Sequence, residues 1–355
     1  MSTRYKDLLG IELCVIQSPM AGVQGSNLAI AVSEAGGLGS LPCGMLSIEQ
    51  IVSEIEAIKA ATSKPFNLNF FCHDASPFNQ QRQAIWQNEL KPFFDELDLD
   101  MKLAAGGANR VPFSHEIADA IEPFSPEFIS FHFGLPGSDL LERVKQWGTK
   151  VVSSATTVEE ALWLESRGVD GIIAQGIEAG GHRGMFLSKD ISTQMGLVAL
   201  LPQIVNRVNV PVIAAGGIAD SRSVHSCLQL GATAVQVGTA YLLCTEAQTS
   251  TLHRQALKEA KSQHTALTNI FSGKPARGIV NRAMRDLGYM SSSVPDFPFA
   301  SIEMTELRKQ AESQGMDDFS PLWCGQNTQG CQEISAKEMT LALAGLRFIE
   351  IGSTT

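Results

Sequence analysis

Eight short apolar runs are the feature of this sequence that most restricts its fold. Each run ends in small or polar residues, and segments of helix length separate the runs along the first 240 residues. The runs cover residues 14–18, 38–41, 66–71, 128–133, 150–155, 171–174, 211–215 and 234–237. Apolar strands that alternate with helices are typical of a parallel sheet with helices on its faces. The sequence therefore predicts an α/β fold.

The positions of the glycines favour a closed barrel over an open sheet. Glycine-rich segments follow the sixth, seventh and eighth runs, at 176–184, at 216–217 and at Gly238. An open doubly wound sheet normally carries its glycine fingerprint after the first strand instead. Eight units of this length also fit a closed barrel. We therefore expect a (β/α)8 TIM barrel with a smaller C-terminal cap region.

The chain divides into three parts on this prediction. A barrel with one long insertion, a cap over the carboxyl ends of its strands and a C-terminal segment are expected at 1–243 (insertion about 72–103), 244–320 and 321–355. The insertion has apolar residues spaced for one helix face between Pro77 and Leu97. A capping box at Ser335 begins a final amphipathic helix, whose apolar positions reach Phe348. We expect that helix to return to the barrel.

The composition excludes several classes of partner. The formal net charge is −10 and no basic run offsets it, which argues against nucleic acid and anionic membrane surfaces. No stretch approaches the roughly 20 apolar residues of a membrane span, and the N-terminus lacks a signal-peptide core, so a cytoplasmic location is expected. Seven scattered cysteines and histidines without metal spacing predict reduced thiols and no metal site. A homodimer is left open.

Ligands of barrel enzymes bind at the carboxyl ends of the strands, and those ends supply the candidate site. The residues there are Met20, Ala21, Gly22, Asn69, His132, Gln175, Gly180, Gly181, His182, Gly216, Gly217, Gln236, Val237, Gly238 and Thr239. The Gly-Gly and Gly-Thr pairs after the last two strands favour a phosphate site, because backbone amides and a threonine hydroxyl donate to phosphate oxygens without a formal cation. Tight turns after the strands are the alternative.

Two amides and two histidines leave more than one interpretation open. Asn69 and Gln175, if buried, need hydrogen-bond partners, and they either bond the edge of a flavin ring or tie loops together. His132 faces ligand or core according to the pleat of its strand. His182 lies in the glycine loop 174–184, in which we expect no strand. Its glycine neighbours allow close approach to a ligand as general base or donor, unless loop backbone holds the ring.

Six segments of the chain carry a resemblance to a known family. They are Pro19-Met-Ala-Gly22, Gly36-Gly-Leu-Gly39, Asn67-Leu-Asn-Phe-Phe71, Ala174-Gln-Gly-x-Glu-Ala-Gly-Gly-His182, Ala215-Gly-Gly-Ile218 and Gln236-Val-Gly-Thr239. They resemble the nitronate monooxygenases, formerly called 2-nitropropane dioxygenases. The later Ser272-Gly-Lys-Pro-Ala-Arg277 and Asp318-Phe-x-Pro-Leu-Trp-x-Gly-Gln326 are similar to the C-terminal part of that family, so the resemblance covers nearly the whole chain. A sister group, the FMN-dependent enoyl-acyl carrier protein reductases, shares much of the glycine-histidine loop.

The resemblance implies a TIM barrel that binds FMN without a covalent link, through the strand-end residues named above. It implies that His182 is the catalytic histidine, and we assign His132 and His182 to the substrate. The family oxidises alkyl nitronates, such as toxic propionate 3-nitronate, with O2 to a carbonyl compound and nitrite. Two rivals are an NAD(P)H-dependent enoyl reductase and a flavin-free barrel that binds a phosphorylated metabolite. Tyrosines are expected in the family's cap, but residues 295–299 read Pro-Asp-Phe-Pro-Phe, which leaves the substrate preference open.

Overall fold

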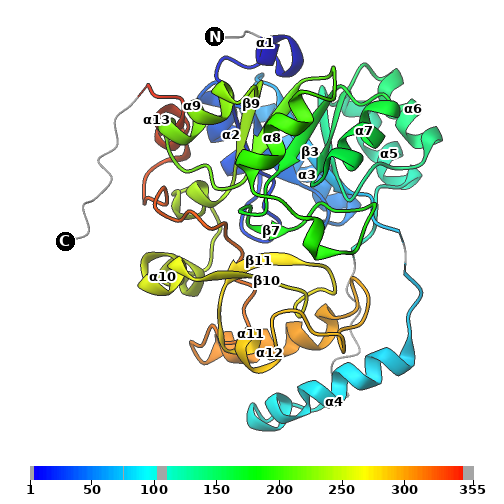
Figure 1. Ribbon diagram of the computed structural model, residues 1–355, viewed down its shortest axis with the longest axis vertical. Helices are drawn as coiled ribbons and strands as arrows, with labels where there is room; N and C mark the ends of the chain where they lie inside the picture. The colour runs from blue at the N-terminus through cyan, green and yellow to red at the C-terminus, as the bar shows by residue number, and fades with distance from the viewer. Residues whose placement is uncertain (1–3, 75, 102–109, 347–355) are drawn as a thin grey trace.

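Eight parallel strands close into a barrel in the computed structural model, which describes residues 4–74, 76–101 and 110–346 (Figure 1). The strands are β1 (Val15–Gln17), β2 (Gly39–Pro42), β3 (Phe66–Phe71), β4 (Phe128–His132), β5 (Lys150–Ala155), β6 (Gly171–Gln175), β8 (Val212–Ala215) and β9 (Ala234–Val237). They are hydrogen-bonded in the order β1-β9-β8-β6-β5-β4-β3-β2, and Gln17 N donates to Leu38 O at 2.9 Å where the ring closes. The predicted (β/α)8 barrel is confirmed.

Helices cover the outside of the barrel and bury its apolar strands. They are α2 (Ser26–Glu34), α3 (Ile48–Ala61), α5 (His115–Ile121), α6 (Ser138–Gln146), α7 (Val158–Ser166), α8 (Leu197–Val205), α9 (Ser221–Gln229) and α13 (Ala336–Leu343). Ile55, Val144 and Ile204 on three of these helices are fully buried in one apolar cluster with the strands. At the end of the barrel where the strands begin, Leu9 of α1 (Arg4–Leu9) is buried in one apolar cluster with Phe128, the first residue of β4. The apolar runs thus meet their helices on the outside, as a (β/α)8 sequence requires.

The last helix packs beside the first ones although it lies at the end of the chain. α13 contacts α2, α9 and the 3-10 turn η4 (Thr239–Leu243). Met339 and Leu343 on its inner face are buried, and the capping box predicted at Ser335 is present. The helix therefore takes the position of the eighth barrel helix. Phe348, which the sequence assigned to the same helix, lies outside the described residues.

A cap with an apolar core of its own lies beyond the carboxyl ends of the strands (Figure 1). Its elements are α10 (Thr251–Lys258), β10 (Thr265–Thr268), β11 (Ala276–Ile279), α11 (Arg282–Asp286), α12 (Ser301–Ser313) and α4 (Gln80–Glu96). α4 comes from the long insertion, yet its Trp86 and Leu90 are buried with Met304 of α12. Gln83 Nε2 also donates to Glu303 Oε2 at 2.7 Å. We therefore propose that α4 belongs to the cap rather than to the barrel.

One short strand in the glycine loop joins the cap to the barrel. β7 (Gly181–His182) pairs antiparallel with β11, which gives a small sheet in the order β10-β11-β7. Beside this pairing, Arg183 N donates to Pro275 O at 2.8 Å. The expectation that the loop contains no strand is therefore wrong at its tip. The reason is that its pairing partner comes from a distant part of the sequence, which local propensity does not detect.

Candidate active site

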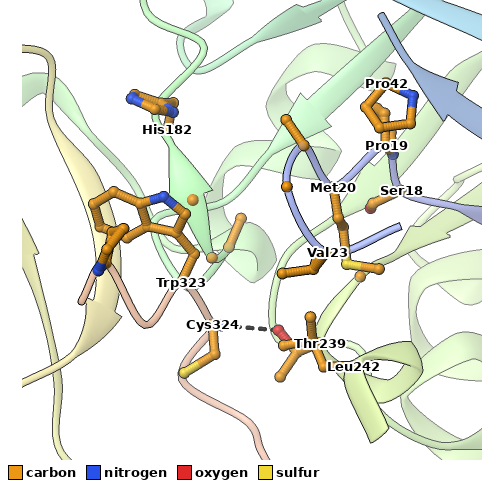
Figure 2. A pocket seen from close by; sticks show the side chains of 18 of the residues that line it. Ser18, Pro19, Met20, Val23, Pro42, His182, Thr239, Leu242, Trp323 and Cys324 are labelled. Atoms are coloured by element: carbon orange, nitrogen blue, oxygen red, sulfur yellow. Dashed lines mark hydrogen bonds between the residues drawn. The ribbon is translucent and has the colours of Figure 1, made fainter. Parts of the chain in front are cut away.

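A cavity of about 280 Å³ lies between the carboxyl ends of the barrel strands and the cap. All the residues that the sequence placed at the strand ends line it: Met20, Ala21, Gly22, Asn69, His132, Gln175, Gly180, Gly181, His182, Gly216, Gly217, Gln236, Val237, Gly238 and Thr239. In Figure 2, His182 and Trp323 lie on one side of the cavity, with Met20 and Val23 on the other. The strand-end residues therefore form one site rather than several.

Two glycines leave open space on the inner surface of the cavity. Gly22 and Gly181 have φ angles of +83° and +70°, and a Cβ atom at either position would meet no atom within 4 Å. A positive φ favours glycine, and the missing side chains let a flat ligand approach the backbone. Gly180 has a different role, because a Cβ there would come within 2.4 Å of the backbone carbon of Cys324. Its small size permits two chain segments to pack together.

The loops after β8 and β9 lie next to each other, because these strands are hydrogen-bonded neighbours. Gly216 and Gly217 have positive φ angles of +122° and +68°, and Thr239 begins the turn η4. Gly325 N donates to Thr239 Oγ1 at 2.8 Å (Figure 2), and Asn327 Nδ2 donates to Gly217 O at 3.2 Å. The C-terminal segment is thus fixed to both loops. Backbone N–H groups at the start of a helical turn are suited to phosphate oxygens.

The segment after α12 forms a wall of the cavity that reasoning from strand ends missed. Its lining residues are Ser320, Pro321, Leu322, Trp323, Cys324, Gly325 and Asn327. Trp323 is the clearest case, since tryptophan is more often a core residue than a ligand contact. The signal for this wall was the motif 318–326, which the sequence analysis used only for the family resemblance.

The side-chain amides of Asn69 and Gln175 at the strand ends form hydrogen bonds with neighbouring segments of the barrel. Gln175 Nε2 donates to His182 O at 3.0 Å, and Gln175 Oε1 accepts from Gly184 N at 2.7 Å. Both polar atoms of Gln175 therefore serve the glycine loop. Asn69 Nδ2 donates to Ser130 Oγ at 2.9 Å and to Ser130 O at 3.1 Å. Asn69 Oδ1 accepts no hydrogen bond from a described residue, so this oxygen is the amide atom still available to a ligand.

A buried arginine fixes the loop that carries His182. Arg183 is fully buried, and its Nη1 and Nη2 each donate at 2.8 Å, to Gly176 O and to Gln175 O. Its Nε donates to Gln194 Oε1 at 2.9 Å. Burial lowers the pKa of the Arg183 guanidinium to about 9, so the group remains charged at neutral pH. Because the planar guanidinium of Arg183 donates to three acceptors in fixed positions, it restricts the conformation of the loop.

His182 is enclosed by aromatic rings and hydrogen-bonded to a serine. Its Nε2 lies 2.8 Å from Ser272 Oγ. Four aromatic rings surround the imidazole. Their centroids lie at these distances from that of His182: Phe71 at 6.4 Å, Phe133 at 6.0 Å, Phe297 at 5.8 Å and Trp323 at 5.7 Å. Burial, and next the charge of Arg110, hold the pKa of His182 well below its usual 6.5. The imidazole is therefore neutral at neutral pH, with one nitrogen that donates and one that accepts.

His132 lines the cavity, but both of its ring nitrogens have protein partners. Its Nδ1 lies 3.1 Å from Ser154 Oγ, and its Nε2 lies 3.2 Å from His182 O. Burial lowers the pKa of His132 to about 4, so the ring is neutral. A neutral ring whose Nε2 carries the proton would donate to the carbonyl of His182. Its contacts are those of a side chain that positions the loop around His182.

The remaining histidines and the cysteines are spread over buried and exposed positions. His73 and His253 are buried, whereas His115, His225 and His264 are exposed. Within the described ranges, no group of three or more His, Cys, Asp or Glu side chains could hold a metal ion. All seven cysteines are free thiols. No helix in the described part of the chain is long and apolar enough to span a membrane.

A sequence model of the nitronate monooxygenase family matches residues 2–344 of the chain. The chain belongs to this family. It is 38% identical over 348 residues to a nitronate monooxygenase of Pseudomonas aeruginosa. The matched region covers 97% of this chain and 98% of that protein. A probable nitronate monooxygenase of Staphylococcus saprophyticus is 35% identical over 338 residues, covering 95% of each chain. The predicted family is thus confirmed, and the chain is an enzyme, an oxidoreductase.

Two solved structures resemble the whole chain. A nitroalkane oxidase from Streptomyces ansochromogenes superposes with a TM-score of 0.87 at 33% identity, over 97% of both chains. FabK from Thermotoga maritima superposes with a TM-score of 0.73 at 26% identity, over 97% of this chain and 96% of that chain. The higher score and identity of the first structure agree with the family assignment.

Four residues around His182 escaped the sequence analysis, and Arg110 among them lines the cavity. They are Arg110, Ser272, Lys274 and Phe297, all of which lie near His182. Ser272 and Lys274 belong to the motif 272–277, so a signal for them existed in the family resemblance. Arg110 lies in a loop away from any strand end, and no local pattern marks it. Phe297 lies where the family's tyrosines were expected.

Proposed function

We propose that this enzyme oxidises alkyl nitronates, with bound FMN and O2, to a carbonyl compound and nitrite. The observation that carries the proposal is the neutral, ring-enclosed His182, bonded to Ser272 in a cavity at the strand ends of a nitronate monooxygenase family barrel. Propionate 3-nitronate is the substrate type that we propose. A role in detoxification and a cytoplasmic location follow from it as predictions.

Features of the cavity lining support FMN as the cofactor. The side-chain-free surfaces at Gly22 and Gly181 give a flat ring access to the backbone, and Asn69 Oδ1 is available to its edge. We propose that the loops at Gly216–Gly217 and Gln236–Thr239 bind the phosphate through backbone amides. When bound, FMN supplies the electron-accepting chemistry that the side chains in the cavity lack. Of the proposed cofactor residues, Gln175 acts by holding the glycine loop in place.

The state of His182 suits a nitronate better than a neutral nitroalkane. A nitronate is already a carbanion equivalent, so its oxidation needs no strong base. The neutral imidazole and Ser272 Oγ can orient the substrate's oxygens by hydrogen bonds. A nitroalkane must first lose a proton from carbon, and a histidine whose pKa is held low is a weak acceptor for that proton. We therefore expect nitronates to be oxidised faster than the corresponding nitroalkanes.

Nitrite release tests this function. The purified protein should carry FMN that denaturation releases intact. It should form nitrite from propionate 3-nitronate in air without added NAD(P)H. A flavin-containing protein that forms no nitrite from any alkyl nitronate would contradict the proposal.

A second candidate is NAD(P)H-dependent enoyl reduction, because the sister group shares the glycine-histidine loop 174–182. In that case His182 would lie beside the nicotinamide or transfer a proton. Consumption of NADH with an enoyl thioester under nitrogen would support this activity.

A further inference from the structure

Two cationic side chains, Arg110 and Lys274, act electrostatically on His182, and neither forms an ion pair with a described residue. Nη1 of Arg110 is buried and has no hydrogen-bond partner among the described residues, and Arg110 lines the cavity. Lys274 Nζ lies 4.4 Å from the ring centroid of Phe133. Asp74 and Asp296 are the carboxylates that act on Lys274, and neither forms an ion pair with it in the described chain. Within the described chain, neither of these positive charges is thus held in an ion pair.

The two cations converge on one aromatic ring beside His182. The guanidinium carbon of Arg110 lies 5.2 Å from the ring centroid of Phe297, and Lys274 Nζ lies 5.9 Å from it. The same centroid lies 5.8 Å from that of His182. An anionic group placed between these cations would therefore lie close to a substrate that contacts the histidine. Arg110, Lys274 and the ring of Phe297 thus form one cluster beside His182.

We propose that Arg110 and Lys274 form a subsite for a carboxylate carried by the nitronate substrate, and that they select doubly anionic over singly anionic nitronates. That the substrate is a nitronate rests on the proposed function, whereas the carboxylate subsite is inferred from the geometry alone. A buried guanidinium nitrogen without an acceptor is unfavourable, and a carboxylate supplies the missing acceptor. Arg110 can bond such a group in a bidentate manner, which Lys274 cannot.

The net charge of the whole protein gives a doubly anionic substrate no long-range attraction. The formal net charge of −10 repels a dianion at long range. Burial lowers the pKa of Arg110 to about 10, which leaves it protonated at neutral pH. A substrate that carries a carboxylate therefore meets attraction at the cavity itself rather than during its approach.

The first test compares two nitronates of similar length in Arg110→Gln and Lys274→Gln variants. The ratio of kcat/KM for propionate 3-nitronate to that for butyl-1-nitronate should fall about 10-fold or more in Arg110→Gln, since a charged hydrogen bond is lost for one substrate only. Lys274→Gln should lower the ratio less. Lys189→Gln is the matched control, because it removes one exposed positive charge near Lys274. An unchanged ratio in Arg110→Gln overturns the proposal, since Arg110 would then serve the nitronate group common to both.

The second test measures binding without turnover. Succinate has the shape and charge of propionate 3-nitronate, and butyrate lacks one of its charges. Titration calorimetry of the FMN-loaded enzyme should give succinate at least about 10-fold tighter binding than butyrate, and Arg110→Gln should remove the difference. Equal binding of both anions by the wild type, or the same loss in Lys189→Gln, overturns the subsite. Selective succinate binding by a protein that forms no nitrite would support the subsite while the proposed function fails.

Discussion

His182 Nε2 and Ser272 Oγ lie 2.8 Å apart although 90 residues separate them in the sequence. The pairing of β7 with β11 brings them together, because it places His182 opposite Ala276. The histidine comes from a barrel loop and the serine from the cap. The side chain of His182 is thus oriented jointly by both parts of the enzyme, and a change in either part is expected to alter its position.

Replacement of His182 tests its catalytic role. His182→Asn should lower kcat for propionate 3-nitronate by about 100-fold, within the range for loss of a positioned acid–base group. FMN content should stay near that of the wild type, since the histidine does not line the phosphate loops. Nitrite assays and the flavin spectrum measure the two effects, with the exposed His225→Asn as control. Near-normal turnover would remove His182 from the mechanism.

Replacement of Ser272 tests the hydrogen bond to the histidine. Ser272→Ala should lower kcat by about 2- to 10-fold, which corresponds to one neutral hydrogen bond. The effect should nearly vanish in a His182→Asn background, because the serine acts through the histidine. Ser166→Ala removes a hydroxyl from an exposed position and should have no effect. Full additivity of the two substitutions would show that Ser272 acts independently of His182.

Replacement of Arg183 tests the anchoring of the glycine loop. Arg183→Lys keeps the charge but cannot serve the acceptors Gly176 O, Gln175 O and Gln194 Oε1 together. We expect the free energy of unfolding to fall by about 3 kcal/mol. Urea unfolding followed by circular dichroism measures this, and Arg222→Lys at an exposed helix position should change it by less than about 0.5 kcal/mol. Equal stability of both variants would contradict the anchoring role.

The burial of His253 predicts that the folded protein loses stability in acid. The pKa of His253 is lowered to about 4, first by burial and then by Arg308, while Asp317 and the Trp323 backbone oppose this. The unfolded chain takes up a proton near pH 6.5 that the folded protein excludes, so this contribution to stability is present above pH 6.5 and is lost as the pH falls toward 4. His253→Gln should reduce the loss between pH 7 and 4.5 by about 2 kcal/mol. Its Nε2 has no hydrogen-bond partner among the described residues, so the substitution removes none there. An unchanged pH profile of the unfolding free energy would contradict the low pKa.

The barrel and the strand-end residues could be predicted because their signals are local. Apolar runs such as Phe66–Phe71 and Lys150–Ala155 coincide with the observed strands. Once the strands are fixed, the barrel geometry brings their carboxyl ends together, and Met20, Asn69 and Gly238 must meet there.

The cap side of the site could not be predicted because its contacts join distant segments. Trp86 of the insertion donates from Nε1 to Ala300 O, a pair that is 214 residues apart. Arg110 reaches the cavity through tertiary packing, and a single arginine in a loop has no periodic signature. The strand β7 likewise exists only through its partner β11.

Anaerobic mixing of the FMN-loaded enzyme with propionate 3-nitronate, and separately with NADH, tests the central claim most directly. The visible flavin band is followed by stopped-flow absorbance in both experiments. Our account predicts that the nitronate alone changes the flavin band within the time of one turnover and that NADH leaves it unchanged. A band that NADH bleaches rapidly and the nitronate does not would contradict nitronate oxidation and favour the reductase.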